Sequence, residues 1–327
     1  MKIAQPGARP AKDETMRIGV SACLVGNPVR YDGGHRLASF VAETLSRHCT
    51  VVPVCPEVEC GLPVPRETMH LVGDPAAPRL VTTGTGIDHT ERLLGWARQR
   101  LPELAADDLS GFIFKSRSPS CGVQRVKVLT GAAGFRRVGV GLFARQLMAH
   151  SPLVPVEEDD RLSDEAVREN FIERIFAGQR WRACRQKAMH RDGLAAFHAS
   201  HQLQIMAHSE QHCRALGRLV ATAGELPVVE LFARYQALLC QALARLATRK
   251  KNAKVLQQMA GSLRRMLTAG EKAELRTSID RYRAGTLPLA VPITLVGSLV
   301  RQHGVAALAG QTYLAPHPLE IQLRSHA

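Results

Sequence analysis

Four cysteines in the first half of the chain each follow a short apolar run that predicts a buried strand. The runs span residues 17–21, 50–54 and 111–114, and the cysteines behind them are Cys23, Cys55, Cys60 and Cys121. Thiolates are the usual ligands of iron–sulfur clusters, and folding can bring widely spaced cysteines together. The pattern therefore indicates such a cluster, with buried free cysteine as the alternative. Structural zinc is disfavoured because no pair has C-x-x-C spacing.

A catalytic cluster needs one iron left open for substrate, as a catalytic zinc keeps a free position. Three cysteine ligands fit this requirement better than four. The remaining thiols lie within strand or helix patterns and are interpreted as packing residues: Cys49, Cys184, Cys213 and Cys240.

From Arg17 to Asp160 strand-like runs alternate with helix-like runs. Besides the three strands above, residues 137–140 and 153–156 are expected to be strands, and residues 37–47, 88–104 and 142–150 helices. Strands separated by helices predict an α/β domain with a mostly parallel, Rossmann-like sheet. In such sheets ligands bind beyond the carboxyl ends of the strands, which is where the four cysteines fall.

The second half of the chain predicts an all-α domain, because it is rich in Ala, Leu, Arg and Gln and has few prolines. Helices are expected over residues 163–176, 182–190, 195–223, 228–266, 271–283 and 293–302. We expect three parts: a tail at residues 1–15, an α/β cluster domain at 16–160 and a basic helical domain at 161–327.

The composition is that of a soluble globular protein, with 45% hydrophobic and 22% charged residues. The first residues have no apolar segment of the kind found in a secretory signal, and no run reaches membrane-spanning length. We therefore expect a cytoplasmic protein with no membrane partner. Eight cysteines in 327 residues are too few for a disulfide scaffold, so clustered thiols favour metal ligation.

The net charge of +14 is concentrated in the second half of the chain. Residues 161–327 hold 24 Lys and Arg against 12 Asp and Glu, whereas residues 1–160 hold 19 against 17. Such asymmetry favours contact with a polyanion, with a solvated helix face as the alternative. Candidate phosphate contacts are the basic segment 245–254, which includes Arg249, Lys250 and Lys251, and the pair Arg264 and Arg265. His208 and His212 are four residues apart, but packing or RNA contact is favoured over metal binding because no H-E-x-x-H pattern is present.

Three segments of the first half resemble the signature segments of the thiouracil and thiouridine desulfidase family. They are SACLVGNPVRYDGGHR (residues 21–36), VCPEVECGLPVPRE (54–67) and KSRSPSCG (115–122). The second half resembles the YbgA-type domain in HASHQLQIMAHSEQH (198–212), ATRKKNAKVLQQM (247–259), EKAELRTSIDRYRAGTLPLAVPITL (271–295) and QTYLAPHP (311–318). The fused arrangement is similar to desulfidases that act on 4-thiouridine in transfer RNA.

The resemblance implies a [4Fe-4S] cluster held by Cys23, Cys55 and Cys121. Many relatives have glycine at the position of Cys60, which is therefore an alternative ligand. The family's catalytic carboxylate and serine map onto Glu57 and Ser118. Residues near these motifs that could hold phosphate, ribose or one another are Arg30, Asp32, Arg66, Lys115 and Arg117.

These expectations combine into a transfer RNA 4-thiouridine desulfidase, which would form uridine and sulfide by hydrolysis with no net redox change. The cluster would draw electron density from C4 as a Lewis acid, and the target base would have to be turned out of the RNA. A desulfidase of free thiouracil or thiouridine nucleotides is one alternative. A cluster-bearing stress sensor that binds nucleic acid without turnover is another. The oligomeric state is left open.

Overall fold

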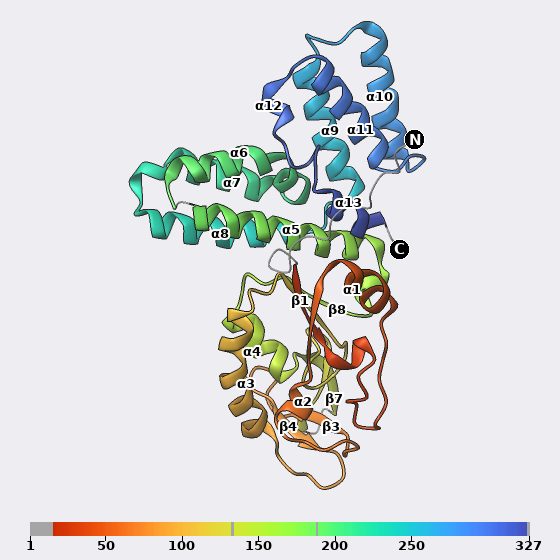
Figure 1. Ribbon diagram of the computed structural model, residues 1–327, viewed down its shortest axis with the longest axis vertical. Coiled ribbons are helices and arrows are strands. Elements are labelled where there is room, and N and C mark those ends of the chain that lie inside the picture. The colour runs from red at the N-terminus through yellow and green to blue at the C-terminus, as the bar shows by residue number, and fades with distance from the viewer. Residues whose placement is uncertain (1–15, 132–133, 188, 326–327) are drawn as a thin grey trace, which may run out of the picture. The chain divides into compact units, whose positions relative to one another are not determined.

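The computed structural model describes residues 16–131, 134–187 and 189–325 (Figure 1). The tail expected at residues 1–15 lies outside this range. The chain divides into two compact units between Glu165 and Ala166. Each unit has its own hydrophobic core, and each is described separately below.

The first unit is built on a parallel sheet with the strand order β2-β1-β5-β8. The strands are β1 (Arg17–Ser21), β2 (Thr50–Val54), β5 (Gly111–Phe114) and β8 (Val156–Glu158), and every neighbouring pair is parallel. The expected parallel sheet is therefore confirmed, and three of its strands have the predicted bounds. The central strands β1 and β5 are almost fully buried, as their apolar runs indicate.

The last strand of this sheet begins later than the expected residues 153–156. It includes two acidic residues, and one of them, Glu158, is only 4% exposed. Its carboxylate accepts hydrogen bonds from the backbone N–H groups of Val123 and Gln124, at 2.7 and 3.2 Å. Because these bonds compensate burial of the charge, an acidic side chain is accommodated in a buried strand.

A second four-stranded sheet, of order β4-β3-β6-β7, was not expected. It contains β3 (Met69–Val72), β4 (Arg79–Thr82), β6 (Val126–Leu129) and β7 (Phe135–Gly139). The strand predicted at residues 137–140 is β7, so its assignment to the parallel sheet was wrong. It pairs antiparallel with β6, and β3 pairs antiparallel with β4. Short strands that mix polar and apolar residues, such as MHLV, RLVT and VKVL here, give only a weak hydrophobic pattern, which explains the omission.

Helices and short turns complete the first unit. They are η1 (Ala22–Val25), η2 (Phe40–Leu45), α1 (Ser46–His48), α2 (Pro56–Glu59), α3 (Thr90–Ala106), α4 (Leu142–His150) and η4 (Arg161–Ser163). The helix expected at residues 37–47 is a π-helical segment followed by one α-helical turn. In the core, the Phe112 and Phe114 rings stack 4.2 Å apart, and Phe143 of α4 meets both edge-on at 5.9 Å.

The second unit is helical, as predicted. Its helices are α5 (Glu165–Lys187), α6 (Arg191–His208), α7 (Glu210–Ala221), α8 (Val228–Leu243), α9 (Arg249–Leu263), α10 (Ala269–Ala284), α11 (Ala290–Gln302), α12 (Ala306–Ala309) and α13 (Pro318–Ser325). A short turn, η5 (Ala223–Glu225), joins α7 to α8. Within the described ranges, no helix is both long and apolar enough to cross a membrane.

Several predicted helix boundaries in this unit were wrong. The helices expected at 163–176 and 182–190 are the single helix α5. Those expected at 195–223 and 228–266 are each split in two. The first split falls at Ser209, whose hydroxyl accepts the His212 backbone N–H and so caps the start of α7. The second lies between α8 and α9, where Thr248 adopts an extended conformation.

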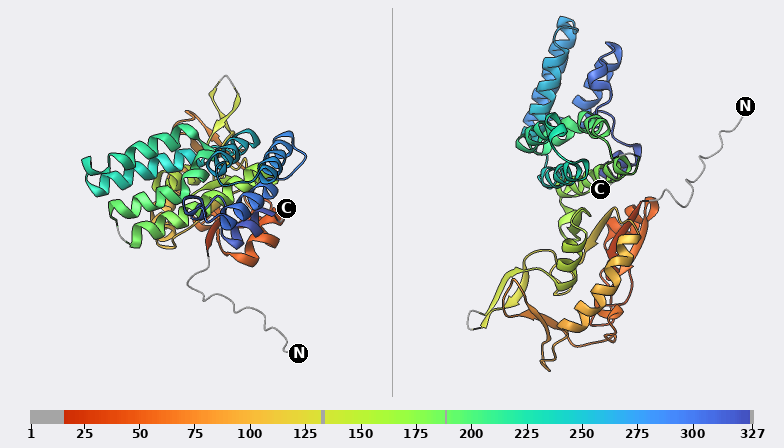
Figure 2. Two further views of the ribbon diagram at one scale, coloured as in Figure 1. Left: turned by 90° about the horizontal axis from the view of Figure 1, so that it is seen from above. Right: turned by 90° about the vertical axis from the view of Figure 1, so that its left-hand side faces the viewer.

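Two cores hold the helices together. Helices α5 to α8 pack around Trp181, whose ring stacks on Phe232 and Tyr235 at 5.5 and 5.1 Å. These four helices are seen nearly end-on in the right-hand view of Figure 2. A second cluster joins α6, α9, α10 and α11 around the fully buried Leu256 and Met259.

Gly19 allows β1 to pack closely against the aromatic core. A Cβ at Gly19 would lie 2.2 Å from Cδ2 of Phe112. The replacement Gly19→Ala is expected to destabilise the first unit by about 1–3 kcal/mol, the usual cost of overpacking. Denaturant unfolding followed by tryptophan fluorescence measures this. Gly95→Ala in α3 is the matched control, because its nearest neighbour is 3.7 Å away. Equal stability of the two variants would contradict the packing argument.

Candidate functional site

Three cysteines meet in one pocket at the carboxyl edge of the parallel sheet. In the order β2-β1-β5, Cys55 follows β2, Cys23 follows β1 and Cys121 lies in the loop after β5. All three line a cavity of about 250 Å³. Its wall also includes Val29, Tyr31, Glu57, Arg66, Met69 and Ser118. Parallel strands present their carboxyl ends at one edge, so neighbouring strands bring their following loops together.

Local backbone structure fixes the first two thiols. Cys23 lies in the η1 turn, which ends at Gly26 in the left-handed conformation with φ 92°. Cys55 is the N-cap residue of α2, and Pro56 occupies the first helical position, where its missing N–H costs nothing. The backbone N–H of Cys55 donates to the Glu59 carboxylate at 2.8 Å.

The loop of Cys121 is held by the start of α4. Backbone N–H groups of Gly141 and Phe143 donate to the carbonyl oxygens of Gly122 and Ser120, at 2.7 and 2.9 Å. Gly141 lies directly against this loop, because a Cβ there would be 2.6 Å from the Ser120 carbonyl carbon and 2.8 Å from the Cys121 nitrogen. The first turn of α4 therefore orients Cys121.

The surroundings of the thiols stabilise their protonated forms. Burial, and then the proximity of Cys55, raises the pKa of Cys23 to about 11. Burial also raises the pKa of Cys55, and it raises that of Cys121 well above its usual value. A bound metal displaces the proton from a coordinating thiol, so these groups become thiolates when they bind a positively charged centre.

This donor set suits a cluster better than a single ion. In the described ranges, no three His, Cys, Asp or Glu side chains are grouped closely enough to hold one metal ion. A four-iron cluster attaches each thiolate to a different iron, so its ligands stand farther apart than those of a single tetrahedral ion. Three thiols line one cavity, each from a different loop, with Cys23 and Cys121 buried and Cys55 half-buried, and they fit that requirement.

Glu57 is the carboxylate of the pocket, and both of its oxygens have partners. Arg66 Nε donates to Oε2 at 2.9 Å, and its Nη2 contacts the same oxygen. The Ser120 hydroxyl donates to Oε1 at 2.8 Å. The Arg66 and Glu57 side chains are only 6% and 15% exposed, so the pair is shielded from solvent. These contacts fix the direction of the carboxylate.

Ser118 is arranged to donate a hydrogen bond into the pocket. Its oxygen accepts the backbone N–H groups of Ser120 and Cys121, at 3.2 and 3.1 Å. These contacts use the lone pairs of the hydroxyl and leave its proton available. The Ser118 side chain is also one wall of the cavity.

The other residues predicted to bind substrate in this unit form ion pairs with one another or with nearby carboxylates. Arg30 pairs with Asp32 at 3.2 Å, Lys115 with Asp159 at 3.0 Å and Arg117 with Asp160 at 3.3 Å. The hydrogen bond between the two side chains lowers the pKa of Asp32 and raises that of Arg30. Each of these cations is therefore held by a carboxylate of the same unit. Arg30, Lys115 and Arg117 also line the cavity.

Cys60, the alternative ligand, has a different environment. Its thiol donates to the Glu57 carbonyl oxygen at 3.2 Å, and its side chain packs against the hydrophobic core. The residues that line the cavity include the other three cysteines of this region but not Cys60. The geometry therefore favours Cys23, Cys55 and Cys121.

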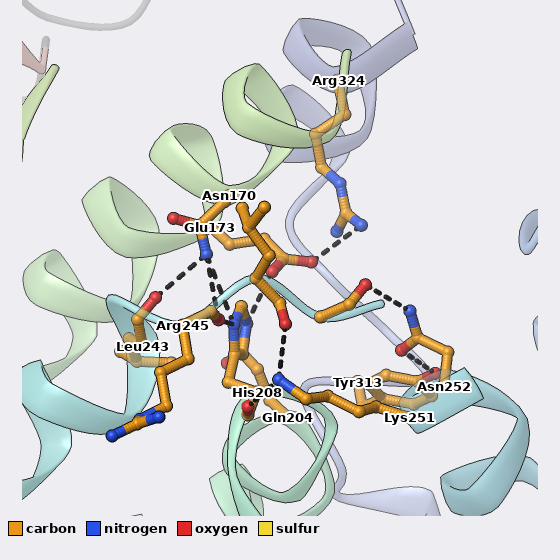
Figure 3. Close-up of polar contacts among 12 residues, drawn as sticks. Asn170, Glu173, Gln204, His208, Leu243, Arg245, Lys251, Asn252, Tyr313 and Arg324 are labelled. Carbon is orange, nitrogen blue, oxygen red and sulfur yellow. Dashed lines mark hydrogen bonds and ion pairs between the residues drawn. The ribbon is translucent and has the colours of Figure 1, made fainter. Parts of the chain in front are cut away.

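The basic segment of the second unit is partly engaged within its own domain (Figure 3). The Lys251 ammonium donates to the carbonyl oxygens of His208 and Leu246, at 2.7 Å each. Desolvation lowers its pKa. His208 is 1% exposed and lies 2.7 Å from Glu173, so it is a buried polar residue of the helical core. Arg249 and Lys250 are exposed.

Sequence reasoning did not identify Ser120 or Asp159 as parts of the site. Ser120 holds Glu57, and Asp159 binds Lys115 and the Ser116 backbone N–H at 2.7 Å. The serine lies inside the KSRSPSCG motif, which could have indicated it. Asp159 lies in an acidic turn after β8, and only the pairing of β8 with β5 brings it to this loop.

The family model described as 2-thiouracil desulfurase matches residues 18–159, and that for DUF1722, a protein of unknown function, matches 202–318. The chain is 28% identical to the uncharacterized protein YbgA of Escherichia coli (strain K12) over 46% of this chain and 90% of the relative. It is 32% identical to the uncharacterized protein YbbK of Bacillus subtilis (strain 168) over 32% of this chain and 72% of the relative.

A solved structure described as the [4Fe-4S]-dependent thiouracil desulfidase TudS is 32% identical, covers 45% of this chain and 93% of its own, and has a TM-score of 0.39. The fold and the pocket define the class: an α/β domain with three converging thiols, joined to a helical domain. The chain belongs to the 2-thiouracil desulfurase family, with a DUF1722 domain after the desulfurase domain.

The contact between Gly141 and the cysteine loop generates a second prediction. Gly141→Ala is expected to displace the loop, because the new methyl group would overlap the backbone of Ser120 and Cys121. In metal-free protein, Cys121 should then react faster with a thiol reagent, measured by mass spectrometry of its peptide. Gly95→Ala is the control and should leave the rate unchanged. An unchanged rate in Gly141→Ala would show that α4 does not position the loop.

Proposed function

We propose that this protein is an iron–sulfur-dependent desulfidase, with a [4Fe-4S] cluster held by Cys23, Cys55 and Cys121. The observation that supports it most is the convergence of these three thiols and the paired carboxylate Glu57 on one cavity. Three ligands leave one iron free, and such a cluster supplies a Lewis acid that binds the soft sulfur of a thiocarbonyl.

The residues of the pocket supply the proton transfers that replacement of sulfur by water requires. Glu57, held by Arg66, accepts a proton from the attacking water and returns it to the pyrimidine. The Ser118 hydroxyl donates a hydrogen bond to the ring or to the water. Arg66 and Ser120 are positioning residues, because they direct the two carboxylate oxygens and have no need to touch substrate.

The substrate we propose is 4-thiouridine in transfer RNA, and the product is uridine with release of sulfide. The excess positive charge of residues 161–327 supports this choice, since a polyanion is the partner such a domain attracts. The helical domain would hold the RNA, with the target base turned out of its stack to reach the pocket. The second candidate substrate is free thiouracil or its nucleotides. The description of the solved relative as a thiouracil desulfidase favours it.

Replacement of single cysteines tests the ligand set. Cys23→Ser, Cys55→Ser and Cys121→Ser are each expected to lower iron from about four per chain to near zero in protein prepared without oxygen. Iron and sulfide analysis measures this. Cys60→Ser is the control, because its thiol packs outside the cavity. Loss of the cluster in Cys60→Ser, with retention in one of the other three, would overturn the assignment.

Replacement of Glu57 tests the proton transfer. Glu57→Gln is expected to retain iron but to lower turnover by about 10²–10⁴-fold, because the amide cannot accept the proton of water. Sulfide release under anaerobic conditions is the readout, and Glu91→Gln on the exposed surface of α3 is the control. Turnover that survives in Glu57→Gln would rule out this mechanism while leaving the reaction itself open.

A comparison of substrates separates the two candidates. Sulfide release from transfer RNA that contains 4-thiouridine should exceed release from free 4-thiouracil at matched concentration. The reverse order would assign the activity to the free base. RNA binding with no sulfide release from either substrate would favour a sensor over an enzyme.

A further inference from the structure

The second unit contains a groove between α9 and α10 that the desulfidase reaction does not use. Its volume is about 300 Å³, at the lower end of the range for ligand pockets. One stripe of α9, the turn after it and one stripe of α10 form its walls. The residues are Gln257, Ala260 and Gly261 on α9, Arg264 and Leu267 in the turn, and Lys272, Leu275, Arg276, Ile279 and Asp280 on α10. The apolar part comes from Ala260, Leu267, Leu275 and Ile279, and the rim is charged.

The charges on this rim are unbalanced. Arg264, Lys272 and Arg276 are exposed, and none has a side-chain hydrogen bond or ion pair within the described ranges. Asp280 is the groove's carboxylate, so three positive charges and one negative charge leave a net +2. Lys272 and Arg276 are also four residues apart on one helix, an arrangement in which like charges repel each other.

On the α9 side the groove is lined by an exposed glycine, Gly261. No atom lies within 4 Å of a Cβ built at Gly261. Glycine is a poor helix former, and Gly261 is inside α9. Neither packing nor a left-handed backbone requires glycine here, and the effect of its small size is to keep the groove open.

From these observations we infer that the α9–α10 groove binds the sugar–phosphate backbone of RNA. Arg264, Lys272 and Arg276 would neutralise phosphates, and the apolar floor would contact ribose. No aromatic side chain lines the groove, so it suits backbone recognition better than base stacking. This inference rests on the proposed RNA substrate and assigns the contact to a different segment from Arg249, Lys250 and Lys251.

The test measures binding of the intact, cluster-loaded protein to transfer RNA by fluorescence anisotropy over a range of salt concentrations. The double variant Arg264→Gln/Arg276→Gln is expected to bind more weakly and to lower the log–log salt slope by about 1.4–1.8, the contribution of two phosphates. The control with the same charge change is Lys187→Gln/Arg218→Gln, at exposed positions of α5 and α7. It should retain the wild-type slope.

A third variant tests the groove without changing charge. Gly261→Leu replaces a poor helix former with a good one, so its fold should be retained, and its side chain should fill the groove. Binding of transfer RNA is expected to weaken about tenfold, equivalent to about 1.4 kcal/mol. Melting temperature and iron content, measured on all variants, report folding separately from binding.

The outcomes distinguish this inference from the proposed function. The groove assignment would be overturned if both Arg264→Gln/Arg276→Gln and Gly261→Leu kept the wild-type salt slope and affinity. RNA binding and desulfidation by the wild-type protein would then still stand. Wild-type affinity in Gly261→Leu alone would also overturn it, since the charges would then act outside the groove. If the wild-type protein binds no transfer RNA, the groove assignment and the RNA substrate both fail, and desulfidation of the free base remains testable.

Discussion

The candidate site depends on the order of three parallel strands. Because β2, β1 and β5 are neighbours and parallel, the loops that follow them leave the sheet at one edge. Cys55, Cys23 and Cys121 are far apart in the chain and come together only there. If one of the three strands were antiparallel, the loop that follows it and its thiol would lie at the opposite edge of the sheet. The buried, apolar strands β1 and β5 are therefore needed both for the sheet and for bringing the three thiols together.

A second constraint is that the pocket shields two ion pairs from solvent, Arg66 with Glu57 and Lys115 with Asp159. Every carboxylate or cation that was predicted to act there has an opposite charge beside it, as Glu57 has Arg66 and Lys115 has Asp159. Burial of an unpaired charge costs several kcal/mol, so pairing is what allows these groups near the thiols. The Glu57 carboxylate is in addition directed by two donors, Arg66 and Ser120, rather than by one.

The cations of the helical domain fall into two groups, those with internal hydrogen-bond partners and those without. Lys251 donates to backbone carbonyl oxygens and helps to join α6 to the segment before α9, whereas Arg264, Lys272 and Arg276 have no such partners in the described ranges. Net charge alone cannot separate these two groups. Cations without such partners can bind a polyanion, and these three line the same groove.

The sequence by itself determined the fold class, the three strands that precede the cysteines and the helical character of the second half, because buried strands are short apolar runs and amphipathic helices have a clear period. Motif resemblance supplied the family. Only the tertiary structure decided that Cys60 packs away from the cavity, that Ser120 and Arg66 share Glu57, and that Asp159 reaches Lys115 through the β5–β8 pairing. The second sheet and the helix break at Ser209 were also not predicted from the sequence. Contacts between distant residues depend on strand order and packing, and neither is written in the local pattern of side chains.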